Sequence, residues 1–277
     1  MARVCRAVSK EKLQDLCDVI YVPRLKTLWA EDERYGVPYL TALEVFYFRP
    51  LRVRYISKSI PRFEDYLVKY GWLLIERSGT VGRVAFVNKT LERFLIADHM
   101  IRLIPKETTL SGYVYAWLIS PFCQRLFQAS QFGMVVRELD PYCLRNLPVP
   151  ILPPNIQREI HEMIVRAWEM RDKAIELEDK AVYLVEKKVL KLEEQEHVKP
   201  SLSFSITLSD ILQRDELRLD VTYHSAEATW ATAVLKRCGY PIKRLEELSL
   251  RIFNPPPLKR YIVIGEENVG EPYLPPA

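Results

Sequence analysis

Histidine and cysteine are too few and too scattered in this sequence to indicate a catalytic or metal site. The 277 residues include four histidines and five cysteines. No two cysteines are spaced as Cys-x-x-Cys, so neither a disulfide framework nor a zinc site is suggested. A Ser-His-Asp or Cys-His centre is not indicated either, because each needs a histidine beside its nucleophile. We therefore expect a protein with no catalytic centre, metal or cofactor of its own.

Long apolar runs and a nucleotide-binding glycine motif are missing as well. No apolar run reaches the roughly 18 residues of a membrane-spanning helix, and residues 1–10 lack the apolar stretch of a signal peptide. The glycine loop at 79–82 lacks the Lys-Ser/Thr pair of a phosphate-binding P-loop. A hydrophobic content of 48% is nevertheless enough for a core at this length. These features predict a folded cytoplasmic protein.

Positive charge is concentrated in the first half of the chain. Residues 1–150 hold 22 Lys/Arg against 15 Asp/Glu, a net charge of +7. Residues 151–199 hold 9 against 11, and residues 200–277 hold 9 against 10. A basic globular segment beside two nearly neutral ones is typical of a module that contacts phosphates.

The basic segment, residues 1–150, has the pattern of an α+β domain. Short β-rich runs at 73–75, 83–87 and 100–104 are separated by glycine and proline. Residues 112–131 have helical spacing of apolar and aromatic side chains, which predicts a helix packed in the core. The core positions expected there are Tyr115, Leu118, Ile119, Phe122 and Leu126.

A proline-rich hinge separates this domain from a long predicted helix. Residues 147–154 read LPVPILPP, where each proline removes an amide donor and restricts the residue before it. Asn155 is a candidate N-cap, and apolar or small residues then recur in alternating steps of four and three from Ile156 to Leu184, while Pro200 ends the predicted helix. We interpret residues 151–199 as a hinge and a spacer helix of about 60 Å.

The seam of this helix favours pairing with another helix. Alanine occupies every second layer, which allows close approach and favours an antiparallel partner over a parallel dimer. A long helix that lies on its own domain is the alternative interpretation. The predicted seam consists of Ile160, Met163, Ala167, Met170, Ala174, Leu177, Ala181 and Leu184.

Two stretches of the sequence resemble each other and predict a duplicated unit. Residues 12–40 align with residues 244–274, with Leu13 matching Leu245 and Leu16 matching Leu248. Both copies end in Gly-x-Pro-Tyr-Leu, at 36–40 and 270–274. Repeats this far apart indicate a duplicated module and not a solenoid. Residues 200–277 are therefore predicted to begin a second, incomplete domain.

The order of these motifs resembles a known family. The relevant stretches are GVPYL (36–40), WLLIERSGTVGRVAFV (72–87), ADHMIRL (97–103), GYVYAWLISPFCQRLF (112–127), LPVPILPPNIQREI (147–160) and RLDVTYHS (218–225). Together with the heptad helix they resemble the first half of type I restriction-modification specificity subunits and the start of the second. The resemblance implies a target recognition domain in residues 1–150, antiparallel pairing of two spacer helices, and sequence-specific binding of double-stranded DNA. The family carries two complete recognition domains, whereas this chain has one.

The resemblance also implies the partners of the chain. An adenine methyltransferase subunit and a restriction subunit with translocase and nuclease activity would supply the chemistry, so S-adenosylmethionine, ATP and Mg would bind to them. A half-subunit that pairs with a second copy is one arrangement that would complete the target. A fragment of a fused restriction-methylation enzyme and a coiled-coil assembly scaffold are the alternative functions.

Two clusters contain the residue types that duplex DNA requires, which are cations for phosphates and short polar side chains for base edges. The first cluster, assigned mainly to the DNA backbone, consists of Arg49, Arg52, Arg54, Lys58 and Arg62. The second, assigned to base edges, is a glycine loop with Arg77, Ser78, Thr80 and Arg83. His99 and Arg137 are further candidates. A solvated charged face is the alternative interpretation of each cluster.

Overall fold

The computed structural model describes residues 9–49, 54–106, 110–132, 138–192, 205–212 and 219–251. The chain divides into two compact units, residues 1–182 and 183–277. The first unit contains the predicted α+β domain together with most of the spacer helix. Each unit is described by itself below.

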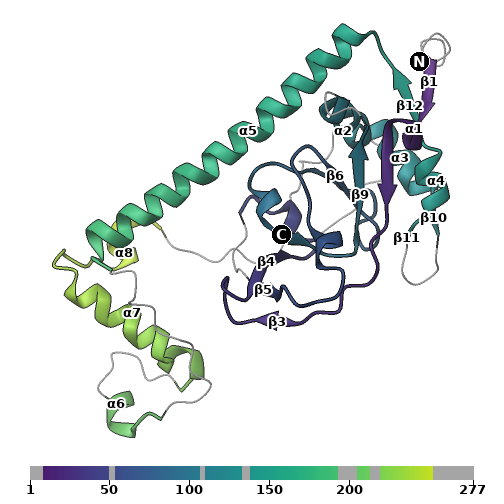
Figure 1. Ribbon diagram of the computed structural model, residues 1–277. Coiled ribbons are helices and arrows are strands. Elements are labelled where there is room, and N and C mark those ends of the chain that lie inside the picture. Colours follow the sequence, from purple (N-terminus) through teal and green to yellow (C-terminus); the bar gives the residue numbers. More distant parts are fainter. Residues whose placement is uncertain are drawn as a thin grey trace, which may run out of the picture. The chain divides into compact units, whose positions relative to one another are not determined.

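Two four-stranded sheets form the centre of the first unit (Figure 1). The first sheet is antiparallel, in the order β2 (Cys17–Ile20), β9 (Met100–Pro105), β6 (Leu73–Glu76) and β7 (Val84–Phe86). The second has the order β3 (Trp29–Ala30), β5 (Arg54–Ser57), β4 (Gly36–Leu40) and β8 (Leu95–Ile96), with β4 and β8 parallel. The β-rich runs predicted from the sequence form β6, β7 and β9.

Two short strand pairs complete the sheet structure of this unit. Strand β1 (Ser9–Lys12) pairs with β12 (Pro148–Ile151), which is the proline-rich segment before the spacer helix. Strand β10 (Gln131–Phe132) pairs with β11 (Glu138–Leu139). The β1–β12 pair therefore fastens the start of the domain to the hinge.

Alternating side chains of β6 separate two parts of the core. Leu73 and Ile75 pack in one apolar cluster with β9 and the helices, whereas Leu74 packs in another with β7 and β8. Strands β6, β7 and β9 are therefore buried on both faces, which is why they are almost continuously apolar. Arg102 of β9 is also fully buried, and it donates hydrogen bonds to the carbonyls of Ala97, Met100 and Ile96. Burial lowers the pKa of this guanidinium to about 10.

The first unit also has short helices. Their bounds are α1 (Leu13–Leu16), η2 (Glu44–Phe46), η3 (Phe63–Tyr66), η4 (Leu91–Arg93), α2 (Ser111–Ile119), α3 (Pro121–Ala129) and α4 (Pro141–Arg145). Helices α2 and α3 contribute side chains to the apolar cluster of Leu73 and Ile75. The helix predicted at 112–131 is broken into α2 and α3, because Ser120 caps α3 by accepting from the amide of Cys123 and Pro121 follows at its first position. Ile119 and Phe122 flank this break and are exposed, contrary to their predicted place in the core.

The spacer helix α5 (Pro154–Leu184) follows β12 and is shorter than predicted. It begins at Pro154 and not after an Asn155 cap, because the carbonyl of Pro153 accepts the first helical amide bonds. A π-helical turn, η6 (Val185–Val189), follows it, and Lys191 has a left-handed φ of 53°. The helix thus ends well before Pro200, where it was predicted to stop, and its 31 residues span about 46 Å.

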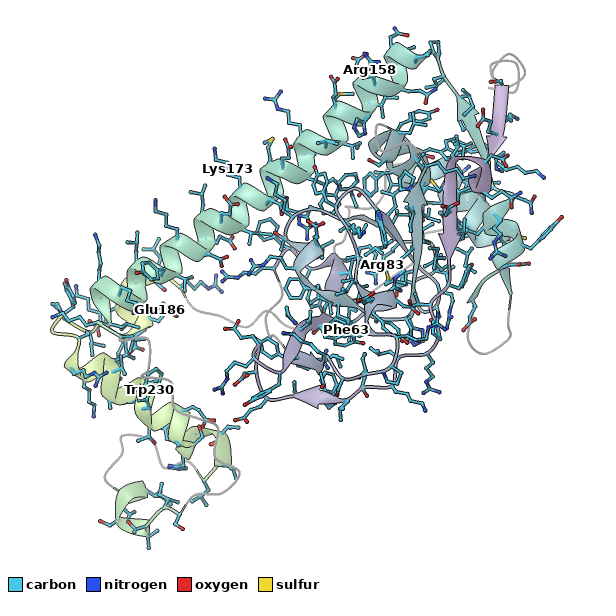
Figure 2. The ribbon with its side chains drawn as sticks, viewed as in Figure 1. Phe63, Arg83, Arg158, Lys173, Glu186 and Trp230 are labelled. Carbon is cyan, nitrogen blue, oxygen red and sulfur yellow. The ribbon has the colours of Figure 1, made fainter. Side chains whose placement is uncertain are left out.

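Helix α5 has an inner face that packs on the domain and an outer face that is largely exposed among the described residues. Trp168 and Ile164 pack against the domain core, and Asp172 and Ile175 are buried. Ile160, predicted for the seam, also packs on the domain, because it lies one turn before Ile164. Figure 2 shows exposed side chains such as Lys173 extending from α5. The interpretation of a helix lying on its own domain therefore holds for one face.

Most of the predicted seam lies on the outer face. Met163, Met170 and Leu177 are 59%, 64% and 58% exposed. Ala167, Ala181 and Leu184 are exposed as well, and Ala174 is half-buried. The apolar stripe is therefore separate from the surface that docks the helix to its domain.

The second unit contains short helices after the π-turn. They are α6 (Leu208–Leu212), η7 (Val221–His224), α7 (Ala226–Arg237) and α8 (Leu245–Leu248). The start of the predicted repeat has the same local structure in both copies. Helices α1 and α8 each have four residues, and the amide before each helix donates to the acid at the third helical position, Lys12 to Asp15 and Arg244 to Glu247. The rest of the second copy, residues 252–274, lies outside the described residues.

Candidate nucleic-acid interface

The loop between β6 and β7 is held by an ion pair at its base. Arg83 Nε donates to Glu76 Oε2 over 2.7 Å, and the same guanidinium lies 4.2 Å from the centre of the Phe46 ring. Glu76 is buried, so Arg83 compensates its charge. Gly82 has a φ of 88°, and a side chain there would come within 2.9 Å of the Phe127 ring. Arg83, which was predicted to contact bases, is thus paired with Glu76 at the base of the loop, and Figure 2 labels it within the first unit.

The tip of this loop meets a second segment of the domain. The Ser78 hydroxyl and His99 Nδ1 form a hydrogen bond of 2.9 Å, and the Arg77 amide donates to the His99 carbonyl. His99 and Thr80 are exposed. Residues from two positions in the sequence that were predicted separately therefore lie at one place on the surface.

A third segment reaches the same place through β11. Glu138 forms a β-bridge with Ser78, and its Oε2 lies 3.9 Å from Arg77 Nε. Arg77 Nε is buried without a hydrogen-bond partner among the described residues. Burial raises the pKa of the nearby Tyr21 to about 12, against the opposing charges of Arg145 and Arg77. We call the residues Arg77, Ser78, Thr80, His99 and Glu138 the loop surface.

The first predicted cluster is divided by the fold. Arg49 points to α5 and pairs with Asp179 at 2.5 Å. Arg54 pairs with Glu44 at 3.0 Å and stacks against the rings of Trp29 and Tyr39. These two cations are therefore engaged within the domain. Arg52, like Arg137 of the other candidates, lies outside the described residues.

Arg62, another member of the cluster, lies beside two cations from outside the cluster. Arg62 lines a groove of about 200 Å³ together with Arg24, Lys26, Pro23, Ile60, Pro61 and Tyr66. The Tyr66 hydroxyl donates to the Pro23 carbonyl and joins the two walls of the groove. Lys58 is exposed and immediately follows Ser57, whose amide donates a hydrogen bond to the carbonyl of Leu28. We call Arg24, Lys26 and Arg62 the basic groove.

The cations of the basic groove differ in their pairing. Arg62 has a left-handed φ of 56° and pairs with Asp65 at 2.6 Å. Arg24 and Lys26 are exposed, and neither forms an ion pair with another described residue. They are therefore the two cations of the groove that are available for an external anion.

Sequence reasoning missed Glu138, Arg24 and Lys26. Glu138 follows Arg137, a candidate, but only the bridge to Ser78 places it at the loop surface. Arg24 and Lys26 flank the buried Leu25, and that alternation of exposed cations around an apolar residue was the available signal. No group of three or more metal-ligating side chains occurs in the described part of the chain. Among these residues no helix is long and apolar enough to cross a membrane.

The part of the chain that holds both surfaces also matches a known family. A family model described as "Type I restriction modification DNA specificity domain" matches residues 7–180, which is more than half of the chain. The chain belongs to this family. The match to the specificity domain ends close to residue 182, where the first compact unit ends. It therefore includes the loop surface, the basic groove and the docked part of α5.

Several solved structures are similar to the chain. The type I restriction-modification S subunit from M. genitalium has 17% sequence identity and a TM-score of 0.47, over 68% of this chain and 47% of that one. The HsdS subunit from Thermoanaerobacter tengcongensis has 17% identity and a TM-score of 0.43, over 65% and 44%. A structure concerned with complex assembly and conformational transition of the type I R-M system has 16% identity and a TM-score of 0.44, over 65% and 43%. The matched region spans less than half of each of these proteins, and no curated protein matches the sequence.

Proposed function

We propose that this chain reads one half of a bipartite DNA target as the specificity component of a type I restriction-modification complex. The observation that carries the proposal is the convergence of Ser78, Thr80, His99 and Glu138 at one place in a specificity domain, where Thr80 and His99 are exposed and Ser78 and Glu138 are half-buried. Hydroxyls can donate to or accept from base edges in the major groove, and a carboxylate accepts from the amino group of cytosine. The loop surface thus offers both kinds of contact.

The basic groove would hold the DNA backbone. Arg24 and Lys26 have exposed charges without an acid partner among the described residues, which suits phosphate contacts that fix register without reading sequence. Arg62 would contribute less, because Asp65 already compensates its charge. Arg77 would orient the loop surface from below through Glu138.

The outer face of α5 would pair with an antiparallel helix that carries the second recognition domain. Its large side chains alternate with alanines, so a partner helix could approach closely. That partner would come from the same subunit or from a second copy of the chain. Two recognition domains held at a fixed separation would make the number of base pairs between the half-sites, here called the gap, part of the specificity.

Catalysis in this proposal belongs to other subunits in the cytoplasm. An adenine methyltransferase subunit would bring S-adenosylmethionine, and a restriction subunit would bring ATP and Mg. The specificity chain would recruit both to the target and would have no enzymatic activity of its own.

The proposal is tested by sequencing the DNA that the chain selects from a random library in complex with its methyltransferase subunit. We expect a bipartite motif. A S78A/T80A variant should change the preferred bases of one half-site, whereas K26A should weaken all sequences equally. DNA selected without any motif would refute the proposal, and so would an S78A/T80A motif identical to the wild-type motif.

A further inference from the structure

Asp172 is a buried acid in the middle of the spacer helix. Its side chain lies on the inner face of α5, and the residue is only 6% exposed. A carboxylate that is removed from water must be compensated by hydrogen bonds or by an opposite charge. The groups that donate hydrogen bonds to Asp172 therefore show which part of the domain the inner face of the helix binds.

The described residues that donate to this carboxylate all belong to one turn of the recognition domain. Oδ1 accepts from Asn88 Nδ2 at 2.7 Å, from the Thr90 amide at 3.1 Å and from the Thr90 hydroxyl at 2.6 Å. Oδ2 accepts from the Lys89 amide at 3.1 Å. The amide of Leu91, next in the chain, donates to Asn88 Oδ1. Asp172 thus caps the start of η4 from a different element, with a carboxylate at the amide end of the turn.

Four hydrogen bonds in different directions fix the orientation of this turn on the helix. Both carboxylate oxygens are used, and two of the donors are backbone amides that cannot rotate independently. A sliding or rotation of the helix would separate several of these pairs at once and leave buried donors without acceptors. The contact therefore fixes the position and rotation of α5 relative to this turn, which a general apolar contact would not do.

Strand β7 connects this point to the loop surface. Phe86 of β7 stacks on Trp168 of α5, with ring centres 6.1 Å apart and planes inclined by 24°. The strand is followed by the Asn88–Thr90 turn, and it is preceded by Arg83 at the base of the loop. From Arg83 to Asn88 the chain spans about 17 Å at about 3.3 Å per residue. The position of Asp172 on the helix therefore determines where the loop surface lies relative to α5.

We propose that Asp172 is a positioning residue that sets the gap between half-sites at which the complex binds DNA. The inference rests on the proposed function, because α5 would be the spacer between two readers. A rotation of about 10° at the Asp172 contact would move the base of the loop, about 17 Å away, by about 3 Å, which is close to the rise of about 3.4 Å per base pair. Small freedom at this contact is thus enough to admit a gap that differs by one base pair.

The test is the D172N variant, assembled as the full chain with its methyltransferase subunit. Asparagine has nearly the same size but replaces one acceptor oxygen with an amino donor, which would face a donor of the Asn88–Thr90 turn. The matched control is E169Q, which removes the same charge from an exposed position of the same helix. DNA selected from a random library is sequenced, and the half-site bases and the gap length are determined separately.

We expect D172N to keep the half-site bases and to lose gap discrimination. The preference for the main gap over gaps one base pair longer or shorter should fall about fivefold or more, whereas E169Q should match the wild type. A second variant, T90V, keeps the carboxylate and removes only the 2.6 Å hydroxyl donor, so it should give a smaller shift in the same direction. T90V also preserves the test if D172N does not fold.

Two outcomes would overturn the inference. An unchanged gap distribution in folded D172N and T90V would show that Asp172 does not position the reader. Altered half-site bases at an unchanged gap would assign the residue to base recognition. Failure of the wild-type complex to select any bipartite motif would instead refute the proposed function, so the two failures are distinguishable.

Discussion

The clearest quantitative prediction concerns the basic groove and salt. A protein that neutralises phosphates releases the counterions bound there. The logarithm of its association constant therefore falls linearly with the logarithm of the salt concentration, with a slope of about −0.9 per phosphate contact. Arg24 and Lys26 are the two groove cations without an ion pair to another described residue, so R24A/K26A should flatten the slope by about 1.8. Each contact weakens the affinity by a factor of about 3.5 when the salt rises from about 50 to about 200 mM. The affinity loss over this range should therefore be about 12-fold smaller for the double variant than for the wild type.

The assay is fluorescence anisotropy of labelled duplex at several salt concentrations, with the methyltransferase complex. Two control variants show whether the effect is local. K173A removes an exposed cation from α5 and should leave the slope unchanged. R62A should flatten the slope by less than one full contact, because Asp65 already pairs with that guanidinium. Equal slopes for the wild type and R24A/K26A would refute the assignment of the groove to the DNA backbone.

Three further predictions concern the docking and pairing of α5. A β-carbon on Gly112 would lie 2.7 Å from the backbone oxygen of His161, so G112A should lower the free energy of unfolding by about 1–3 kcal/mol in thermal denaturation. Burial lowers the pKa of His161 below its ordinary value of 6.5, and its Nδ1 accepts a hydrogen bond from the Gly112 amide. The stability that depends on this neutral imidazole is present above pH 6.5 and is lost as the pH falls below it. The unfolding midpoint of H161N should therefore vary less over that pH range, and an equal pH dependence would contradict the assignment. Charges at the outer face, M170K/L177K, should abolish helix pairing in sedimentation experiments while the melting temperature changes little, because both side chains are exposed.

Local patterns in the sequence predicted much of the fold. The apolar runs that became β6, β7 and β9 are recognisable because these strands are buried on both faces. The seam with Met163 and Met170 was recognisable from its heptad spacing alone. The same pattern could not show that α5 has a second face, because Trp168 and Ile164 lie beside the seam positions and read as a widening of the same apolar stripe.

Contacts between distant positions were not predictable from one sequence. Asp172 reads as one of many charges on a helix, and its partners lie more than 80 residues earlier in the chain. Arg102 interrupts an apolar strand, and only the fold brings four carbonyls around its guanidinium. At the loop surface the residue types were identifiable, but the meeting of Ser78 with Glu138 depends on a β-bridge across 60 positions.

The two faces of α5 have a consequence for engineering new target specificities. The outer face could be shared by many chimaeras, because it depends only on the helix sequence. A grafted recognition domain, in contrast, must bring a turn equivalent to Asn88–Thr90 that fits the acceptor helix at Asp172. A grafted domain that ignores this fit would fold and recognise its half-site bases. Its orientation on the helix, however, would not match the spacing between the two half-sites.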